Sequence, residues 1–219
     1  MLERERERVA HAARRLAADG LVTGTAGNLS ERSGHLIAVT PTGAELHRLD
    51  PGDIAVVDLD GEHIDGELAA TSELGLHLGV YRRYEAGAVV HTHSPLATAL
   101  SCLLDELPVV HYHLLMAGGA IRVAPYRTYG TQELAEVTLD ALQDRAAALM
   151  ANHGAITHAH DLATALELSL ILEWACGVYW HASALGKPRT LDSEQQTAFF
   201  EAVSQRGYGT QQASTEEGE

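Results

Sequence analysis

The stretch Gly87-Ala88-Val89-Val90-His91-Thr92-His93-Ser94-Pro95 is a short apolar run that ends in two histidines one residue apart. The run predicts a buried strand, and Ser94-Pro95 is placed to start a helix that continues to about Leu104. Because alternate residues of a strand point to the same face, His91 and His93 would present two imidazoles side by side at the strand end. This is a metal-binding geometry, although an isolated pair of this kind is more often only a polar strand end.

A second short apolar run also ends at a histidine. Ala146 to Met150 predicts a short strand that leads into Asn152, His153 and Gly154, where the glycine would let the backbone turn sharply. His153 is therefore a third histidine at a strand end. Three neutral imidazoles are a ligand set that zinc accepts, and a catalytic zinc site keeps a further position open to substrate.

A carboxylate stands at the start of a predicted helix. Thr71-Ser72-Glu73 opens a helix to about Tyr84, which Thr71 or Ser72 can cap, and the exposed amides of its first turn form an anion site without a lysine. Without the nearby histidines, Glu73 would be interpreted only as an acidic residue at a helix start, where the helix dipole favours a negative charge. Beside a zinc ion that polarises a carbonyl, it could instead move a proton at the adjacent carbon. Together with the anion site, this predicts a phosphorylated ketose as substrate.

Two turns of small residues flank a strand predicted over His35–Thr40. Thr23 to Ser30 and Pro41-Thr42-Gly43 both contain glycine, so backbone amides could come close to a ligand there. Taken alone, each would be interpreted as a common glycine turn that binds no ligand. The other expected elements are helices over Leu2–Asp19, Thr131–Gln143, Leu162–Leu185 and Ser193–Gln205, strands over Ile54–Leu59 and Ile121–Pro125, and a hairpin around Gly61–Gly66.

Composition limits the remaining choices. The 219 residues are 46% hydrophobic and carry a net charge of -15, which fits one domain, expected over residues 1–209, and disfavours nucleic acid or an anionic membrane as a partner. The first twenty residues lack an apolar signal-peptide core, so we expect a cytoplasmic protein with a small-molecule partner. The final residues, 210–219, have a composition typical of disorder. Cys102 and Cys176 are expected to be buried free thiols.

Several motifs, taken jointly, resemble the class II aldolase/adducin family from about Glu3 to Gly209. They are Gly24-Thr25-Ala26-Gly27-Asn28 with Ser30, Thr40-Pro41-Thr42-Gly43, Ser72-Glu73, Val89-Val90-His91-x-His93, His111-Tyr112 followed by Ala117-Gly118-Gly119, Ala124-Pro125-Tyr126-x-Thr128-Tyr129-Gly130-Thr131-x-Glu133-Leu134, His153-Gly154 and Tyr208-Gly209. The resemblance implies an α/β fold, a single-domain three-layer sandwich with a central, mainly antiparallel sheet flanked by helices. It also implies a homotetramer with active sites at the subunit interfaces.

The resemblance assigns roles to individual residues. His91, His93 and His153 would bind one Zn2+ per subunit, with Glu73 as fourth ligand in the empty enzyme and catalytic acid/base once substrate displaces it. Tyr112 of a neighbouring subunit would handle the proton at the aldehyde oxygen, and Tyr208, near the C-terminus, would help to shape the aldehyde pocket. The residues expected around the substrate phosphate are Thr25, Gly27, Asn28, Thr42, Gly43, Thr71 and Ser72. We expect His111 and His113 to be wall or structural residues.

The implied reaction is the reversible cleavage of a ketose 1-phosphate, L-fuculose 1-phosphate or a close analogue, to dihydroxyacetone phosphate and an aldehyde such as lactaldehyde. The chain departs from the family pattern at a few positions: Thr71 replaces a serine, Tyr129 replaces a phenylalanine, and Asn152 stands where a histidine is common. Thr71 keeps the hydroxyl, whereas Tyr129 could change which aldehyde fits.

Other members of the family remain as alternatives. Its 4-epimerases carry aspartate where Glu73 stands, and they have a different central motif. Dehydratases and decarboxylases share the zinc histidines. An adducin-like interaction module has the same fold but generally lacks these histidines, so the complete trio of His91, His93 and His153 counts against it.

Overall fold

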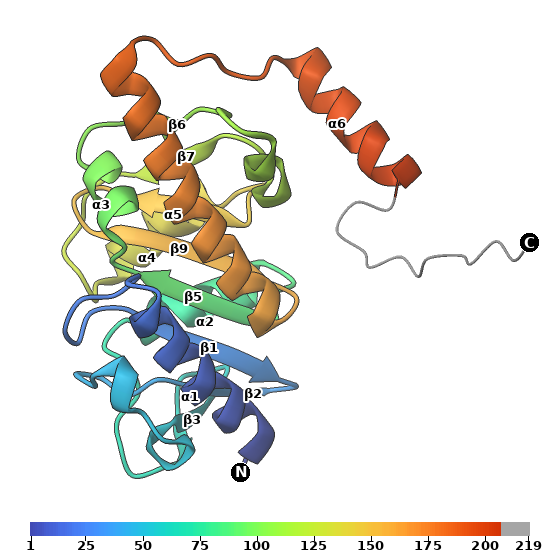
Figure 1. Ribbon diagram of the computed structural model, residues 1–219. Helices are drawn as coiled ribbons and strands as arrows, with labels where there is room; N and C mark the ends of the chain where they lie inside the picture. The colour runs from blue at the N-terminus through green and yellow to red at the C-terminus, as the bar shows by residue number, and fades with distance from the viewer. Residues whose placement is uncertain (207–219) are drawn as a thin grey trace, which may run out of the picture.

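The computed structural model describes residues 1–206 and forms one open sheet of nine strands between layers of helices (Figure 1). The strand order is β4-β3-β2-β1-β5-β9-β8-β7-β6. β7 and β8 pair in parallel, and the other neighbouring strands pair antiparallel. The predicted α/β sandwich with a mainly antiparallel sheet is thus confirmed. The strands are β1 (Asn28–Ser33), β2 (Leu36–Val39), β3 (Ala55–Asp58), β4 (His63–Asp65), β5 (Ala88–Thr92), β6 (Glu106–Leu107), β7 (Ile121–Ala124), β8 (Ala147–Met150) and β9 (Gly154–Ala159).

Some predictions fall beyond the described part of the chain. Tyr208 and the tail over residues 210–219 lie outside the described residues. The role of Tyr208, the disorder of the tail and the domain boundary at residue 209 therefore stay predictions.

The helices form two layers, one on each face of the sheet. α2 (Leu74–Arg83) and α4 (Gln132–Ala141) pack on one face, whereas α1 (Glu3–Ala18), α3 (Pro95–Ser101) and α5 (Leu162–Leu185) pack on the other, nearer the viewer in Figure 1. The chain continues into α6 (Ser193–Arg206), and short 3-10 helices are η1 (Leu46–Arg48), η2 (Pro51–Asp53) and η3 (Tyr112–Ala117).

The side chains of β5 alternate between these two layers. Val89 packs in the apolar cluster that contains α2 and α4, while Ala88 and Val90 pack in the cluster that contains α1. Because the alternation has a period of two, His91 lies on the same face as Val89 and points toward the layer of α2. The strand at the centre of the fold therefore aims its first histidine at the start of α2.

The two-residue β6 was not predicted from the sequence, and neither were two longer strands, β1 and β9. β1 has the polar sequence Asn-Leu-Ser-Glu-Arg-Ser, which lacks the apolar alternation of an ordinary strand, yet Asn28, Ser30 and Glu31 are all buried. β9 begins at Gly154, directly after the turn that contains Asn152; the turn was predicted, but the strand that follows it was not. Both strands flank β5, so the sheet around the histidines is more complete than the sequence indicated.

The starts of the helices follow the predictions with one change. Thr131 and Asp161 cap α4 and α5 as expected, accepting from the backbone N–H groups of Leu134 and Thr164. α2 begins at Leu74, so that Glu73 itself is the N-cap residue and neither Thr71 nor Ser72 takes that position. The hydroxyl of Thr71 instead accepts from the backbone N–H of Glu73 at 3.3 Å, which fixes the backbone that carries this carboxylate.

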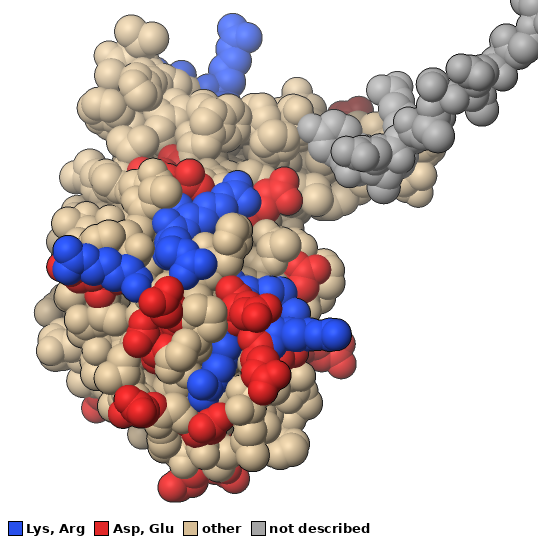
Figure 2. Space-filling model, turned by 60° about the horizontal axis from the view of Figure 1, so that its bottom comes forward, with Lys and Arg blue, Asp and Glu red and all other residues tan. Residues whose placement is uncertain are grey.

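The N-terminal helix carries charges of both signs. Arg8 pairs with Glu5 and Glu31, and Arg15 pairs with Asp19. Figure 2 shows basic and acidic side chains interleaved on one face of the molecule. The charged residues predicted on this helix thus include several ion pairs. Exposed pairs of this kind contribute at most about 1 kcal/mol each.

α5 is a long apolar helix that lies within the fold. By length and composition α5 could cross a membrane, but half of its most apolar window is buried inside the fold, where it packs against β5, β9 and α3. This is the composition of a core helix.

Both cysteines are free thiols. Cys176 is buried as predicted, but Cys102 is exposed, because it lies just beyond the last turn of α3.

Candidate metal centre and active site

The three predicted histidine ligands meet because β5 and β9 are neighbouring antiparallel strands. His91 and His93 lie at the end of β5, and His153 lies in the turn between β8 and β9. Thr92 is opposite Ala155 in the sheet, which brings the end of β5 next to the start of β9. The register of the sheet therefore assembles imidazoles that are distant in the sequence.

The turn that carries His153 depends on both neighbours of this residue. Asn152 has a left-handed backbone with φ 56°, a conformation that asparagine adopts more readily than most residues. A Cβ atom on Gly154 would lie 2.2 Å from the carbonyl oxygen of Thr92. The sharp turn predicted at the glycine is thus located at Asn152, and Gly154 is needed for the close approach of β9 to β5.

Four side chains converge at this point. One ligand atom from each of Glu73, His91, His93 and His153 lies within 4.8 Å of the others. The Nε2 atoms of His91 and His93 are 3.0 Å apart, and Glu73 Oε2 lies 3.2 Å from His91 Nε2. Glu73 Oε1 lies 3.4 Å from His153 Nε2. The predicted set of three imidazoles and one carboxylate is thus brought together in space.

The surroundings of the cluster fit a divalent metal ion. Glu73 Oε1 is buried and has no hydrogen-bond partner, which is costly for a carboxylate oxygen unless a cation or proton satisfies it. His91 Nδ1 contacts the carbonyl oxygen of Ala155 at 2.9 Å, so it donates there and leaves the lone pair on Nε2, the nitrogen that faces the cluster. Neutral imidazoles and a carboxylate are the donors that zinc binds.

Burial and neighbouring charges set the protonation of the cluster. Burial, followed by the charge of His91, lowers the pKa of His93 to about 3 and the pKa of His153 to about 4. Burial also opposes a charge on His91, but the carboxylate of Glu73 raises the pKa of this imidazole. Burial alone would raise the pKa of Glu73, yet its contacts with His91 and Asn28 lower it. Near neutral pH, His93 and His153 are neutral and Glu73 is ionised, as metal binding requires.

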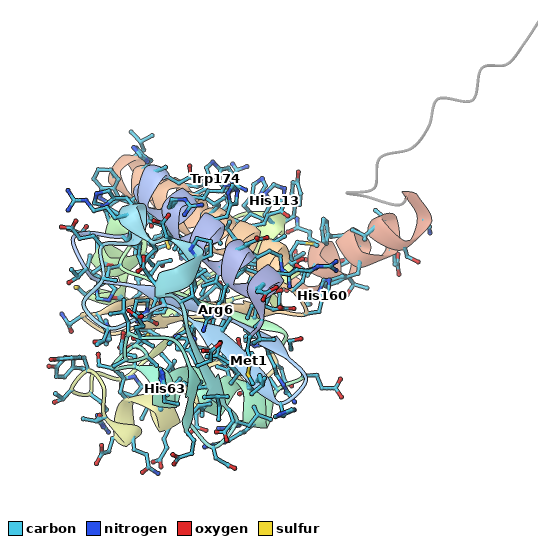
Figure 3. The ribbon with its side chains drawn as sticks, turned by 90° about the horizontal axis from the view of Figure 1, so that it is seen from below. Met1, Arg6, His63, His113, His160 and Trp174 are labelled. Carbon is cyan, nitrogen blue, oxygen red and sulfur yellow. The ribbon has the colours of Figure 1, made fainter. Side chains whose placement is uncertain are left out.

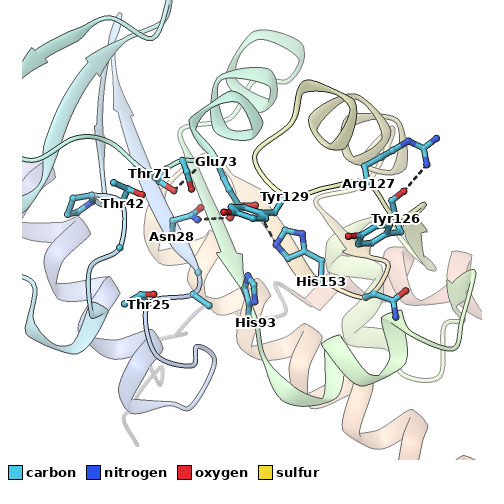
Figure 4. A pocket seen from close by; sticks show the side chains of 16 residues that line it. Thr25, Asn28, Thr42, Thr71, Glu73, His93, Tyr126, Arg127, Tyr129 and His153 are labelled. Carbon is cyan, nitrogen blue, oxygen red and sulfur yellow. Dashed lines mark hydrogen bonds and ion pairs between the residues drawn. The ribbon is translucent and has the colours of Figure 1, made fainter.

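A cavity of about 510 Å³ opens beside the cluster, and Glu73, His93 and His153 line it. Figure 4 shows Thr25, Thr42 and Thr71 on one side of Glu73, and Tyr126 and Arg127 on the opposite side, beyond His153. Tyr129 and Asn152 also contribute to its wall. The lining includes every residue predicted to contact the phosphate: Thr25, Gly27, Asn28, Thr42, Gly43, Thr71 and Ser72.

Tyr112 and the two nearby histidines lie elsewhere. Tyr112 is in η3, with its ring centroid 4.2 Å from that of His111 and 5.2 Å from that of Phe199. His113 lies beside Trp174 of α5, with ring centroids 5.8 Å apart (Figure 3). These residues form an aromatic cluster that does not line the cavity of their own chain.

Several residues around the cavity were not singled out from the sequence. Arg127 lines its aromatic end, and His77 and Tyr81 form a buried polar group behind Asn28 together with Ser30, which the motif had included. A signal for this group existed, because His77 and Tyr81 follow Glu73 at intervals of four residues, the spacing that places side chains on one face of a helix.

Comparison with known proteins gives the same family that the motifs indicated. The model of the Class II Aldolase and Adducin N-terminal domain family matches residues 7–180. The 5-deoxy-D-ribulose 1-phosphate aldolase of Bacillus thuringiensis serovar kurstaki is 37% identical over 214 residues, which cover 96% of this chain and 100% of the relative. The 5-methylthioribulose-1-phosphate/5-deoxyribulose-1-phosphate aldolase of Rhodospirillum rubrum is 38% identical over 202 residues, 91% of each chain.

A solved structure agrees in fold as well as in sequence. An L-fuculose 1-phosphate aldolase superposes with a TM-score of 0.88 and 34% identity, over 92% of this chain and 96% of that one. The convergent ligands and the aldolase-named relatives over most of the chain count against an adducin-like module without a metal site. The chain therefore belongs to the class II aldolase and adducin family, as one of its class II aldolases.

Proposed function

We propose that the chain is a zinc-dependent aldolase that reversibly cleaves a ketose 1-phosphate to dihydroxyacetone phosphate and a short aldehyde. The observation that carries this proposal is a single cavity lined by candidate metal ligands and by the full set of expected phosphate residues. The order of these groups along the cavity matches the order of groups in the substrate: phosphate, carbonyl, then the carbons that leave as aldehyde.

Zinc is the proposed metal, held by His91, His93 and His153, with Glu73 as a fourth ligand before substrate arrives. Three imidazoles with one position that can open are a common catalytic zinc arrangement. When bound, the ion would supply a Lewis acid for the carbonyl and hydroxyl oxygens of the three-carbon fragment.

Glu73 is proposed as the acid/base that moves the proton at the carbon next to the carbonyl. Its carboxylate is 8% exposed, and Oε1 has no hydrogen-bond partner, so this oxygen is available to a proton or a metal. A carboxylate that exchanges a proton in a water-poor site is a competent general acid/base.

The phosphate is proposed to bind at the end of the cavity that Thr25, Thr42 and Thr71 form (Figure 4). Hydroxyls and main-chain amides can bind a phosphate without a charged side chain, and the glycine-containing loops allow the backbone to come close. Gly27 has φ 88°, which favours glycine at that point of the loop. This arrangement explains how an acidic chain could hold an anionic substrate.

The proposed substrates are L-fuculose 1-phosphate and its close analogues, which include 5-deoxyribulose 1-phosphate. Cleavage of either between C3 and C4 gives dihydroxyacetone phosphate, with lactaldehyde from the first and acetaldehyde from the second. The names of the relatives support both, because the two curated relatives act on 5-deoxyribulose 1-phosphate and the solved structure is an L-fuculose 1-phosphate aldolase. The three-carbon fragment is common to the two substrates, so they differ only at the aldehyde end.

We propose a homotetramer in the cytoplasm, with Tyr112 of a neighbouring subunit completing the aldehyde end. Two features support this. Tyr112 does not line the cavity of its own chain, and α5 together with η3 exposes large apolar side chains, among them Trp174, Trp180 and Met116. Large exposed apolar side chains favour contact with another protein surface.

The test combines metal analysis with a product assay. The pure protein should contain about one zinc per chain, and it should form dihydroxyacetone phosphate from at least one member of a panel of ketose 1-phosphates. Activity should fall on treatment with a chelator and return with added Zn2+. A protein that binds no metal, or that turns over a ketose phosphate without releasing that triose phosphate, would contradict the proposal.

A further inference from the structure

A chain of hydrogen-bonded side chains runs from the candidate metal ligand Glu73 into the interior between β1 and α2. Asn28 Nδ2 lies 2.9 Å from Glu73 Oε2, and Asn28 Oδ1 lies 2.6 Å from His77 Nε2. Ser30 Oγ lies 2.7 Å from His77 Nδ1 and 2.7 Å from the hydroxyl of Tyr81. All five residues are buried, and His77 is 0% exposed.

The direction of each hydrogen bond follows from the carboxylate. An ionised carboxylate can only accept, so Asn28 donates through Nδ2 and presents Oδ1 as an acceptor. His77 therefore donates through Nε2, and burial, which lowers the pKa of His77 to about 3, keeps its ring neutral. The Nδ1 atom of a ring protonated at Nε2 is an acceptor, so Ser30 donates to it and accepts from Tyr81. Every donor points toward Glu73.

The secondary structure explains why these residues meet. Glu73, His77 and Tyr81 are spaced by four residues at the start and along one face of α2. Asn28 and Ser30 are two residues apart on β1, on one face of that strand, with Asn28 opposite His91 and Ser30 opposite Val89 of β5. The polar sequence of β1, which concealed the strand from prediction, thus supplies two members of the chain.

We propose that His77 is a positioning residue of the aldolase site. Through Asn28 it holds Glu73 Oε2 in place and leaves Oε1, which is buried without a hydrogen-bond partner, as the oxygen available to the metal and the substrate. This inference rests on the proposed metal-dependent function. It also makes Asn28 a link between the phosphate end of the cavity and Glu73, because an amide nitrogen carries two hydrogens and the carboxylate takes only one.

A second group of buried polar side chains has no connection to the cavity. The hydroxyls of Thr157 and Ser169 lie 2.7 Å apart, and each lies within hydrogen-bonding distance of the carbonyl oxygen of Ala165, on the opposite side of the sheet. That group satisfies itself locally and reaches no residue of the cavity. Ser169→Ala is therefore a matched control, because it removes a buried hydroxyl from the core without touching the site.

The experiment measures the affinity of the purified protein for Zn2+ by competition with a chelating dye, and the ligand sphere by the visible absorption of the Co2+ form. The variants are His77→Phe, which keeps a ring but removes both nitrogens, and His77→Gln, which restores a donor. We expect His77→Phe to weaken Zn2+ binding by about 10-fold, the lower end of the effect of losing a direct partner of a metal ligand, because His77 acts on Glu73 through Asn28. His77→Gln should return the affinity to within about 3-fold of wild type, and Ser169→Ala should leave it unchanged.

Turnover supplies an independent readout. In His77→Phe, kcat for dihydroxyacetone phosphate formation should fall about 10-fold, with a smaller change in KM, because the proton-transferring oxygen is displaced more than the phosphate contacts. Two milder variants extend the test should His77→Phe fail to fold: Ser30→Ala should have a smaller effect than a change at His77, and Tyr81→Phe should have the smallest.

The outcomes separate the inference from the proposed function. Wild-type metal affinity and kcat in His77→Phe, or equal losses in Ser169→Ala, would overturn the positioning role. An order of effects that follows thermal stability and not the distance from Glu73 would also overturn it. Because metal affinity is measured without substrate, a wild-type protein that binds zinc but cleaves no ketose phosphate would refute the proposed reaction alone.

Discussion

The half of the cavity that contains the metal ligands and the phosphate residues, its metal end, is built differently from the aromatic end. At the metal end, His91 is 0% exposed and Glu73 is 8% exposed, and strand register, a helix start and a buried hydrogen-bond chain hold them. At the aromatic end, Tyr126 and Tyr129 are 58% and 69% exposed and lie in the loop between β7 and α4. The metal end is fixed within one chain, whereas the aromatic end is open.

This difference separates reaction type from substrate choice. Groups that must polarise a carbonyl and move a proton need positions held to a fraction of an ångström, which a sheet and its buried contacts provide. Groups that select one aldehyde over another can lie on loops, where the sequence changes without loss of the fold. A substitution at the metal end should therefore abolish the reaction, and a substitution at the aromatic end should only change which substrate is preferred.

The largest effect is expected from removing one imidazole. His153→Ala should lower zinc affinity by about a thousandfold or more, because zinc sites with a full ligand set bind with about 10–16 kcal/mol shared among few ligands. Zinc per chain, measured after dialysis, should fall close to zero and activity should fall with it. His160→Ala, a change at a histidine with a 77% exposed side chain, is the matched control and should retain full metal content. Equal zinc content in both variants would show that the histidine cluster holds no metal.

A smaller but still large effect is expected at the carboxylate. Glu73→Gln keeps the shape and a metal-binding oxygen but loses the basic lone pair, so kcat should fall by about 10²–10⁴-fold. Zinc affinity should fall at least as much as in His77→Phe, but the three imidazoles should still hold close to one zinc per chain when Zn2+ is in excess. Glu133→Gln, at a first-turn glutamate of α4, is the control and should behave as wild type. If Glu73→Gln kept its activity, Glu73 would be only an acid favoured at a helix start.

The three histidines of the metal end could be singled out from the sequence because they stand at strand ends marked by apolar runs, whereas Glu73 stands at a helix start and was added as a ligand through the family resemblance. The same reasoning missed β1, which buries only one apolar residue, Leu29. Its other buried residues are polar because Asn28 and Ser30 join the hydrogen-bond chain behind Glu73, while Glu31 pairs with Arg8. When the buried polar residues of a strand form their hydrogen bonds and ion pairs with residues distant in the sequence, the strand lacks the alternation of apolar and polar residues by which strands are predicted. The register that joins His153 to the other histidines was likewise not visible, because it is set by β9.

The phosphate end should show an intermediate effect that falls on binding and leaves the metal unchanged. Thr42→Val removes a hydroxyl that lines this end, so KM for a ketose 1-phosphate should rise by about 10-fold, the usual effect of losing one hydrogen bond to a charged group. Thr98→Val is the matched control, because the buried Thr98 hydroxyl has no partner and lies outside the cavity. An unchanged KM in Thr42→Val would place the phosphate elsewhere.

The smallest effect is expected at Tyr129, where a substitution should change substrate preference and leave the metal end intact. Its exposed phenol lies at the end where substrates differ, so Tyr129→Phe should lower kcat/KM for L-fuculose 1-phosphate more than for 5-deoxyribulose 1-phosphate, since only lactaldehyde offers a further hydroxyl. The ratio should change by about 3- to 10-fold, as expected for one solvent-exposed hydrogen bond. Zinc content should not change, and Tyr179→Phe on α5 should leave the ratio as it is. If the ratio were unchanged in Tyr129→Phe as well, the choice of aldehyde would belong to residues outside this cavity wall, and the open end would depend on a neighbouring subunit for its selectivity.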